Sequence, residues 1–485
     1  MKKIILILVC LTLILSVCFA LVACNGETSA PMDFSRFRTD EFKNYTDMYL
    51  NENMSSLTVE GKEQGLFLVT GYDSGTVDYK GRPVPDEVSV NDAEAVAANF
   101  DPAKPTIVII HGVQPSEGRY SNAYFWGDNH MGYDVELSEL FYDGSQNYEN
   151  RSWNVLYFHY EQFVEAEGNG KDADLMGNAV IEVNKAIWTM GENGIGSRII
   201  EVDENNNGTW SQEAAFDGSI CEYFVAEYLR FMSNVTAEYP DYLLQRDEIR
   251  FVCHSMGGVT TVSSATLLTA MAEAGEIDKA YLPDRLALID PYVGIYGNQS
   301  LKIAWSGKNI ENFRETYLLG IQYYKKISGG VVEFYVNSEV GVVPYMVIGS
   351  EGSLEKELMT ECAYSVVIPQ YRNVSIVFSG GHNAMREWYF YSYTVQPIRL
   401  YSEDDAVLVN REYVLKDGAT PIGYSPSASL STEDLKKIVG QPVIQKVDTS
   451  SGKDIGVLPY KTYKDSQGNV VKVVTEHIFV PYNKY

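Results

Sequence analysis

A ten-residue stretch, Ile249–Gly258, constrains the fold of this chain more than any other feature. It reads Ile-Arg-Phe-Val-Cys-His-Ser-Met-Gly-Gly, and a run of small and apolar residues from Val259 to Glu273 follows it. This order predicts a buried strand, a sharp glycine-rich turn and a helix, an arrangement that exposes a serine hydroxyl on a strained backbone. We therefore interpret Ser255 as a nucleophile, with Gly257 small enough to let strand and helix approach. The alternative is an ordinary serine at a helix N-cap.

Short β-branched runs alternate with longer amphipathic stretches over most of the chain. Each run is continuously apolar and bounded by polar or turn residues, as expected of strands that are buried on both faces. This alternation predicts an α/β fold with a mostly parallel central sheet and helices on both faces. The predicted strands are Leu66–Thr70, Thr106–Ile110, Asn154–Phe158, Ile249–Cys253, Leu286–Ile289, Val331–Val336 and Ser375–Phe378.

The same patterns divide the 485 residues into four parts. Residues 1–23 are predicted to be a signal peptide, 24–60 a polar tether, 61–395 a catalytic domain and 396–485 a small β-rich C-terminal module. Within the catalytic domain, an insertion of roughly 90 residues, about 159–248, is too long for a simple crossover. Because it is rich in Tyr, Trp and Phe, we expect it to form a lid over the active site and to line the acyl pocket.

A serine hydroxyl becomes a useful nucleophile only when a base takes its proton and a third group fixes that base. Only two of the six histidines, His382 and His477, follow the serine, and His382 stands in Ser-Gly-Gly-His directly after a predicted strand. His382 is therefore the predicted general base. The acid is either Asp290, which ends the strand Leu286–Ile289 before a proline, or Glu339, which follows the next strand.

The segment Asn99–Gly112 predicts a strand that ends in a His-Gly loop, which donates a backbone N–H to an oxyanion. This segment resembles the corresponding part of the pancreatic-lipase-like family of α/β-hydrolases. Three further matches occur in the same order: Trp153–Tyr157 resembles the family's fourth strand, Cys253–Gly257 its serine turn and Leu288–Pro291 its strand-six Asp-Pro. The stretch around His382, with Arg386 and an aromatic run to Phe390, is similar to its histidine helix.

The resemblance implies an α/β-hydrolase fold and a catalytic triad of Ser255, Asp290 and His382. It also implies that the backbone N–H groups of Val113 and Met256 stabilise the oxyanion. For the acid, it favours the aspartate over the glutamate.

The chain departs from the family pattern at two places, which we expect to change substrate preference more than the triad. Cys253 stands where the serine turn usually begins with glycine, and His159-Tyr160 stands where the fourth strand usually ends in Asp-Trp. We expect Cys253 to be a small buried hydrophobic residue. His159 is interpreted as part of the pocket wall.

The N-terminus has the pattern of a targeting segment. Met1-Lys-Lys3 precedes an almost uninterrupted apolar run, Ile4–Leu21, and the tetrad Leu-Val-Ala-Cys24 resembles the lipobox of bacterial lipoproteins. The resemblance implies that Cys24 is lipidated, and two acyl chains would give stable membrane anchoring. We therefore expect a protein of the bacterial cell envelope, anchored to the outer face of the cytoplasmic membrane or exported. The alternative is an ordinary secretory signal with a chance cysteine.

Charge and motif content exclude several classes of partner. The net charge of −27 opposes binding to nucleic acid and to anionic lipid headgroups, so the membrane is contacted through the lipid alone. No CxxC or HExxH motif is present, and no zinc site or other cofactor is expected. Asp203, Asn205, Asn207 and Gly208 match half of a calcium loop, but Ala214 replaces the required glutamate. We interpret this stretch as a hairpin turn and leave calcium binding as the alternative.

Together these features predict a lipid-anchored carboxylic ester hydrolase, an esterase or lipase, that forms an acyl-enzyme at Ser255. The expected substrate is an ester with an apolar acyl group. An acyltransferase or amidase with the same triad is one alternative, and a non-catalytic binding lipoprotein on a hydrolase scaffold is another. A Cys221–Cys362 disulfide is compatible with export and is left open.

Overall fold

The computed structural model describes most of the chain between residues 32 and 475. The described residues are 32–48, 58–59, 62–77, 83–112, 153–160, 163, 168–169, 178–190, 198, 200–202, 207–212, 216–293, 301–337, 352–369, 385, 389–390, 392–393, 397, 399–402, 405–409, 412–421, 423–441, 443–447, 460–464 and 470–475. The chain divides into two units, Met1–Arg36 and Phe37–Tyr485. A short 3-10 helix, η1 (Ser35–Phe37), includes their boundary.

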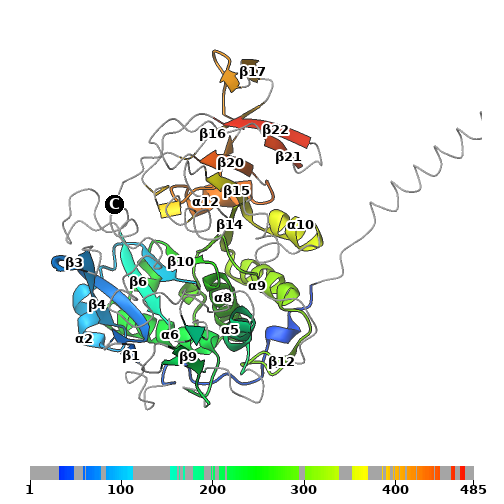
Figure 1. Ribbon diagram of the computed structural model, residues 1–485. Coiled ribbons are helices and arrows are strands. Elements are labelled where there is room, and N and C mark those ends of the chain that lie inside the picture. Colours follow the sequence, from blue (N-terminus) through cyan, green and yellow to red (C-terminus); the bar gives the residue numbers. More distant parts are fainter. Residues whose placement is uncertain are drawn as a thin grey trace, which may run out of the picture. The chain divides into compact units, whose positions relative to one another are not determined.

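A central sheet forms the core of the second unit (Figure 1). Among the described residues it contains nine strands, in the order β20 (Val443–Val447), β15 (Ala363–Pro369), β14 (Val331–Asn337), β11 (Arg285–Ile289), β10 (Ile249–His254), β5 (Thr106–Ile110), β6 (Asn154–His159), β3 (Gly65–Val77) and β4 (Pro83–Ser89). Neighbours from β20 to β6 pair in parallel, whereas β3 pairs antiparallel with both β6 and β4. The predicted α/β class with a mostly parallel sheet is confirmed.

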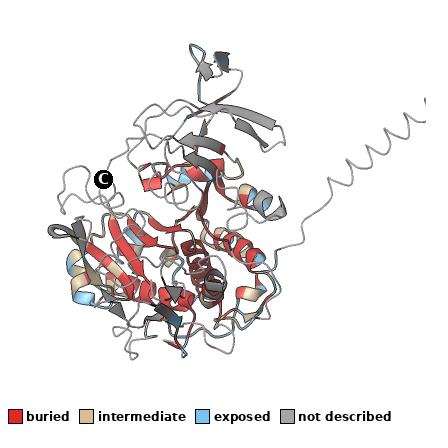
Figure 2. Cartoon of the chain, viewed as in Figure 1, coloured by how far each residue is buried: buried red, intermediate tan, exposed pale blue. Residues whose placement is uncertain are grey.

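Continuous apolar sequence accounts for the central strands. Every residue of β5, β6, β10 and β11 is buried, as parallel strands covered on both faces should be. Figure 2 shows these strands at the centre of the buried region. Six of the seven predicted strands are therefore present, and the seventh, Ser375–Phe378, lies outside the described residues. The position next to β14 is occupied by β15, which the sequence did not single out.

Helices cover both faces of this sheet. The described helices are α2 (Ala93–Asn99), α5 (Asn178–Trp188), α6 (Ile220–Glu238), α7 (Tyr242–Gln245), α8 (Gly257–Ala274), α9 (Phe313–Ser328), α10 (Gly352–Glu361) and α12 (Thr432–Ile438). On one face, Phe251 of β10 makes edge-to-face contacts with Phe224 and Tyr228 of α6. Helix α8 is buried almost along its whole length between α6 and α9, which explains its uniformly small and apolar sequence.

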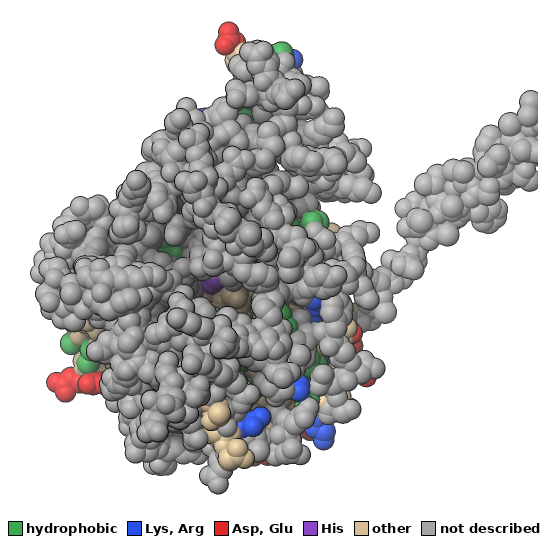
Figure 3. All heavy atoms as spheres, viewed as in Figure 1, with side chains coloured by type: hydrophobic (Ala, Val, Ile, Leu, Met, Phe, Trp, Pro, Cys, Tyr) green, Lys and Arg blue, Asp and Glu red, His purple; other side chains and the backbone are tan. Residues whose placement is uncertain are grey.

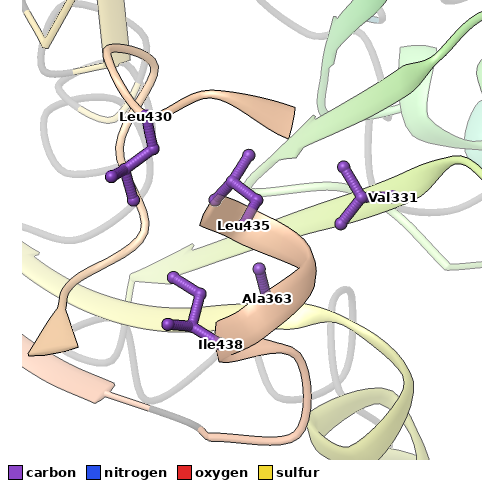
Figure 4. Close-up of a cluster of buried hydrophobic side chains, with 5 residues drawn as sticks. All are labelled: Val331, Ala363, Leu430, Leu435 and Ile438. Atoms are coloured by element: carbon purple, nitrogen blue, oxygen red, sulfur yellow. The ribbon is translucent and has the colours of Figure 1, made fainter. Parts of the chain in front are cut away.

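The opposite face is covered by segments from the C-terminal part of the chain. Figure 4 shows Leu435 and Ile438 of α12 packed with Leu430 against Val331 of β14 and Ala363 of β15. Helix α12 begins after the N-cap Ser431, whose hydroxyl oxygen accepts a hydrogen bond from the Asp434 N–H.

Two buried arginines also bind this C-terminal segment. Arg285 donates to the carbonyls of Ser427 and Leu430, and Arg250 donates to the carbonyl of Ala428. These buried guanidinium groups thus supply hydrogen-bond donors to backbone carbonyls that lie outside strands and helices.

The C-terminal region is rich in strands, but one of them belongs to the central sheet. Strand β20 pairs in parallel with β15 at the sheet edge. The others form a separate four-stranded sheet, β19 (Gly423–Tyr424), β16 (Arg399–Ser402), β22 (Val470–Thr475) and β21 (Tyr460–Lys464), and a hairpin, β17 (Ala406–Val409) and β18 (Glu412–Leu415). The predicted C-terminal module therefore contributes one strand, β20, to the central sheet.

The region 159–248 contributes helices and a small sheet. Strands β7 (Gly168–Asn169), β9 (Asn207–Trp210) and β8 (Ile200–Val202) form an antiparallel sheet, in which β8 and β9 flank the predicted Asn/Gly-rich turn. Cys221 of α6, Cys253 of β10 and Cys362, directly after α10, are buried free thiols. The disulfide between Cys221 and Cys362, left open by the sequence, is not formed.

Candidate active site

Ser255 occupies a strained turn between β10 and α8. Its φ is +55°, a left-handed conformation that costs a residue with a side chain about 1–3 kcal/mol. Backbone hydrogen bonds hold it there: the Ser255 N–H donates to Ile289 O at 3.2 Å, and the Tyr292 N–H donates to Ser255 O at 2.8 Å. Both partners lie at the end of the neighbouring strand β11 or in the loop after it. The predicted strand–turn–helix around this serine is therefore present.

Two glycines let three chain segments meet at this turn. A Cβ on Gly257 would lie 2.4 Å from the Ile110 carbonyl oxygen and 2.5 Å from that of His111, so only glycine permits this approach of α8 to the end of β5. A Cβ on Gly112 would lie 2.7 Å from the Cβ of Ser255. The backbone of the His-Gly loop is consequently in direct contact with the candidate nucleophile.

Asp290 lies directly after β11, in the turn beside Ser255. It is fully buried, has a φ of +41°, and donates its N–H to Tyr335 O at 2.7 Å. A second residue with a side chain is thus strained, one strand away from the first, and strain of this kind is common at functional sites. Ser255 and Asp290 thus lie in adjacent, hydrogen-bonded turns.

Three predicted site residues lie outside the described part of the chain: the base His382, the alternative acid Glu339 and the oxyanion donor Val113. The segment after His382 is described at Met385 and Tyr389, which are both helical and buried. The lipidation candidate Cys24 also lies outside the described residues.

The second predicted oxyanion donor, Met256, follows Ser255 directly and caps α8. Its N–H lies at the amino end of a helix, where backbone N–H groups have no acceptor within the helix and carry partial positive charge. This is a suitable place for a group that stabilises a developing anion.

Tyr160 and His111 form a contact beside the His-Gly loop that sequence reasoning missed. The Tyr160 hydroxyl donates to the carbonyl oxygen of His111, and the two rings lie 4.4 Å apart between centroids. The Tyr160 ring also stacks on Phe158 at 4.7 Å. One indication of this contact was present in the sequence: His159-Tyr160 stands where the family that the chain resembles usually has Asp-Trp.

The neighbouring His159 has a carboxylate partner. Its Nε2 lies 3.0 Å from Oε2 of Glu87 in β4, and both side chains are buried. Phe67 contacts the imidazole edge at a centroid distance of 5.3 Å. Sequence reasoning proposed His159 as pocket wall and did not identify Glu87, because that residue comes from an antiparallel strand at the far end of the sheet order.

Aromatic residues from the region 159–248 extend the cluster that begins at Phe158. Tyr223, in the first turn of α6, contacts Phe158 at 5.7 Å and Phe216 at 5.2 Å, and Phe163 contacts Phe216 at 5.5 Å. All are buried. A continuous set of aromatic contacts therefore leads from the His-Gly loop into this region.

Trp188 belongs to a different aromatic cluster. It is fully buried at the end of α5 and stacks with Trp305 at 5.9 Å and with Phe37 at 6.4 Å. Helix α5 packs against α6 and α8. This part of the insertion therefore joins the helical layer over the sheet.

Cys253 lies two residues before the serine, and its thiol is buried. Burial raises the pKa of its thiol to about 12, so the thiolate is scarcely populated at neutral pH. Its Sγ lies 3.5 Å from the Ala287 carbonyl oxygen. The thiol is a small buried group, as predicted, and Ser255 is the nucleophile candidate of this turn.

Within the described residues, no group of three or more His, Cys, Asp or Glu side chains could hold a metal ion, and no helix is long and apolar enough to span a membrane. On the face drawn in Figure 3, a histidine side chain is visible near the centre, and the Lys and Arg side chains that can be seen lie mostly towards one edge.

Comparison with models of known protein families and with curated protein sequences gave no match, so the functional conclusion rests on the geometry of the site.

Proposed function

We propose that this protein is a serine hydrolase that acts on carboxylic esters through an acyl-enzyme at Ser255. The observation that carries the proposal is the strained turn at Ser255, with its φ of +55° and with the Gly112 backbone against its side chain. A strained serine between a strand and a helix, beside a glycine loop, is the arrangement of a nucleophile turn in α/β-hydrolases. An ordinary N-cap serine has a β-region backbone instead, so the N-cap alternative loses support.

In the proposed reaction His382 takes the Ser255 proton as the hydroxyl attacks the ester carbonyl, and Asp290 orients the imidazole. The buried carboxylate of Asp290, in the turn that is hydrogen-bonded to Ser255, supports this choice of acid. The N–H groups of Val113 and Met256 would stabilise the tetrahedral oxyanion, each by roughly 2.7–4 kcal/mol. The imidazolium gives the Ser255 proton to the alcohol oxygen as the C–O bond of the ester breaks, which releases the alcohol and leaves the acyl-enzyme. The neutral imidazole then takes a proton from water, whose attack on the acyl carbon releases the acid, and the same proton returns to the Ser255 oxygen.

The surroundings favour an apolar acyl group. The aromatic contacts that connect Tyr160 with Phe163 and Phe216 bring the region 159–248 close to the His-Gly loop. We propose that residues between 159 and 219 form the lid and acyl pocket, while α6 serves as the crossover helix before β10. The strands beyond residue 396 that lie outside the central sheet would form the C-terminal module, and lipidated Cys24 would anchor the enzyme to the membrane.

Covalent labelling tests this function. The protein is incubated with a fluorophosphonate probe, and the adduct is located by mass spectrometry; we expect it on the peptide that contains residues 253–257. Ser255→Ala should abolish both labelling and hydrolysis of p-nitrophenyl esters. Ser263→Ala removes a buried serine of α8, the helix that follows Ser255, and should preserve both labelling and hydrolysis. A folded protein that neither reacts with the probe nor cleaves any ester of the panel would indicate a binding scaffold instead.

A further inference from the structure

The position of Tyr160 gives it a direct influence on the His-Gly loop. It follows β6, is fully buried, and donates its hydroxyl hydrogen bond to the carbonyl oxygen of His111. Its ring also lies 4.4 Å from the His111 imidazole, at an interplanar angle of 36°. Tyr160 therefore holds both the backbone and the side chain of the residue that precedes Gly112.

The His111 side chain in turn fixes the next peptide group. Its Nδ1 lies 2.7 Å from the carbonyl oxygen of Gly112. A carbonyl oxygen only accepts hydrogen bonds, so Nδ1 carries the proton and donates it. In a trans peptide, a carbonyl and the N–H of the next residue point in opposite directions. A fixed Gly112 carbonyl would therefore constrain the direction of the N–H that follows it, which is the proposed oxyanion donor.

The same loop is held from its other side by the serine turn. The His111 carbonyl oxygen would be only 2.5 Å from a Cβ on Gly257, so the first residue of α8 rests directly against it. The peptide group between His111 and Gly112 is thus confined between α8 and the Tyr160 hydroxyl. Donors that stabilise a transition state must be held to within about 0.5 Å of their productive position.

We propose that Tyr160 is a positioning residue for the oxyanion hole, acting through the backbone and imidazole of His111. The inference rests on the proposed hydrolase function and adds a residue that acts on the oxyanion hole through His111. It also gives a role to the tyrosine that replaces the family's tryptophan, since a phenol offers a hydroxyl donor that can reach this carbonyl.

Tyr160→Phe tests the proposal because it removes the hydroxyl and keeps the ring. We expect kcat for a p-nitrophenyl ester to fall about tenfold to a hundredfold, less than the loss of a whole oxyanion donor. KM should stay within about twofold, and a trifluoromethyl ketone that forms a tetrahedral adduct should bind more weakly by the same factor as kcat/KM falls. A loss expressed mainly in KM, or unchanged binding of the ketone, would overturn the proposal.

Tyr324→Phe is the matched control. Tyr324 of α9 is also fully buried and donates to a backbone carbonyl, that of Pro283, at 2.8 Å. Pro283 precedes β11, at the end of the sheet opposite the carboxyl ends where Ser255 and Asp290 lie. The control should lose a comparable amount of stability and keep its kcat and its affinity for the ketone.

Amide hydrogen exchange separates this inference from the proposed function. In Tyr160→Phe the peptide that spans residues 106–113 should exchange faster than in the unmutated protein, and in Tyr324→Phe it should not. If the unmutated protein has no hydrolase activity, the proposed function fails while the exchange result still decides whether Tyr160 holds the loop. Unchanged exchange of this peptide in Tyr160→Phe would refute the positioning role.

Discussion

The buried ion pair between Arg285 and Glu333 offers the sharpest test of how the central sheet is held to the C-terminal segment. Both side chains are completely buried, and Nε of Arg285 donates to Oε1 of Glu333. The Arg285 guanidinium also donates to the carbonyls of Ser427 and Leu430, at 2.9 and 2.7 Å. The hydroxyl of Tyr335 donates to the other oxygen of Glu333. Removing either charge therefore leaves the other buried without its partner.

The expected losses of stability follow from these contacts. Glu333→Gln leaves a buried guanidinium facing a neutral amide, and the cost should lie near the lower end of the 3–5 kcal/mol expected for breaking a buried pair, about 3 kcal/mol. Arg285→Met should cost more, about 5 kcal/mol. It leaves the carboxylate unpaired and also deprives two buried carbonyls of a donor, each worth about 1–3 kcal/mol.

The double variant Arg285→Met/Glu333→Leu should be more stable than Arg285→Met alone. It removes both charges, so no buried charge is left unpaired. The carbonyls of Ser427 and Leu430 lose their donor and the Tyr335 hydroxyl loses its acceptor. At about 1–3 kcal/mol, the lost hydroxyl bond costs less than the 3–5 kcal/mol of an unpaired carboxylate. The favourable coupling between the two substitutions is the signature of a charge left without its partner.

Urea denaturation followed by tryptophan fluorescence measures these differences. The control is Glu433→Gln, which breaks the exposed pair between Glu433 and Lys436 and should cost below about 1 kcal/mol. A double variant no more stable than Arg285→Met, or a Glu333→Gln loss equal to that of Glu433→Gln, would show that the buried pair does not hold the sheet to the C-terminal segment in this way.

Three further outcomes are expected. Asp290→Asn should reduce kcat for an ester by about 10⁴-fold, because the imidazole loses its orienting carboxylate, while Glu339→Gln should leave it nearly unchanged; the reverse ranking in steady-state assays would make the glutamate the acid. Cys24→Ala should move the protein from the detergent phase to the aqueous phase in a partitioning experiment, or block processing at that site, and unchanged partitioning would exclude lipidation there. The buried free thiols are those of Cys221, Cys253 and Cys362. In the folded protein at pH 8 they should resist iodoacetamide, because burial raises their pKa. In denaturant without reductant all three should react, because none is in a disulfide, and mass spectrometry counts the modified thiols.

Local sequence determined the strands and the candidate nucleophile. Predominantly apolar runs suffice to predict β5, β6, β10 and β11, because strands buried on both faces are rich in apolar residues. The turn at Ser255 was equally readable. The strand, the serine and the glycine that permits the close approach are all within ten consecutive residues.

Tertiary structure alone decided which distant residues meet. The Tyr160–His111, Glu87–His159 and Arg285–Glu333 contacts join residues 49, 72 and 48 positions apart in the sequence. Each depends on strand order and on register, since a shift of one residue turns a side chain to the other face of the sheet.

The C-terminal strand illustrates the same limit. The sequence predicted a β-rich module in this region. The place of β20 beside β15 depends on the packing of α12 against β14 and β15, and on the arginines that hold the backbone between residues 427 and 430. A periodic pattern specifies which residues must be buried and leaves open which surface buries them. That surface exists only once the central sheet has formed.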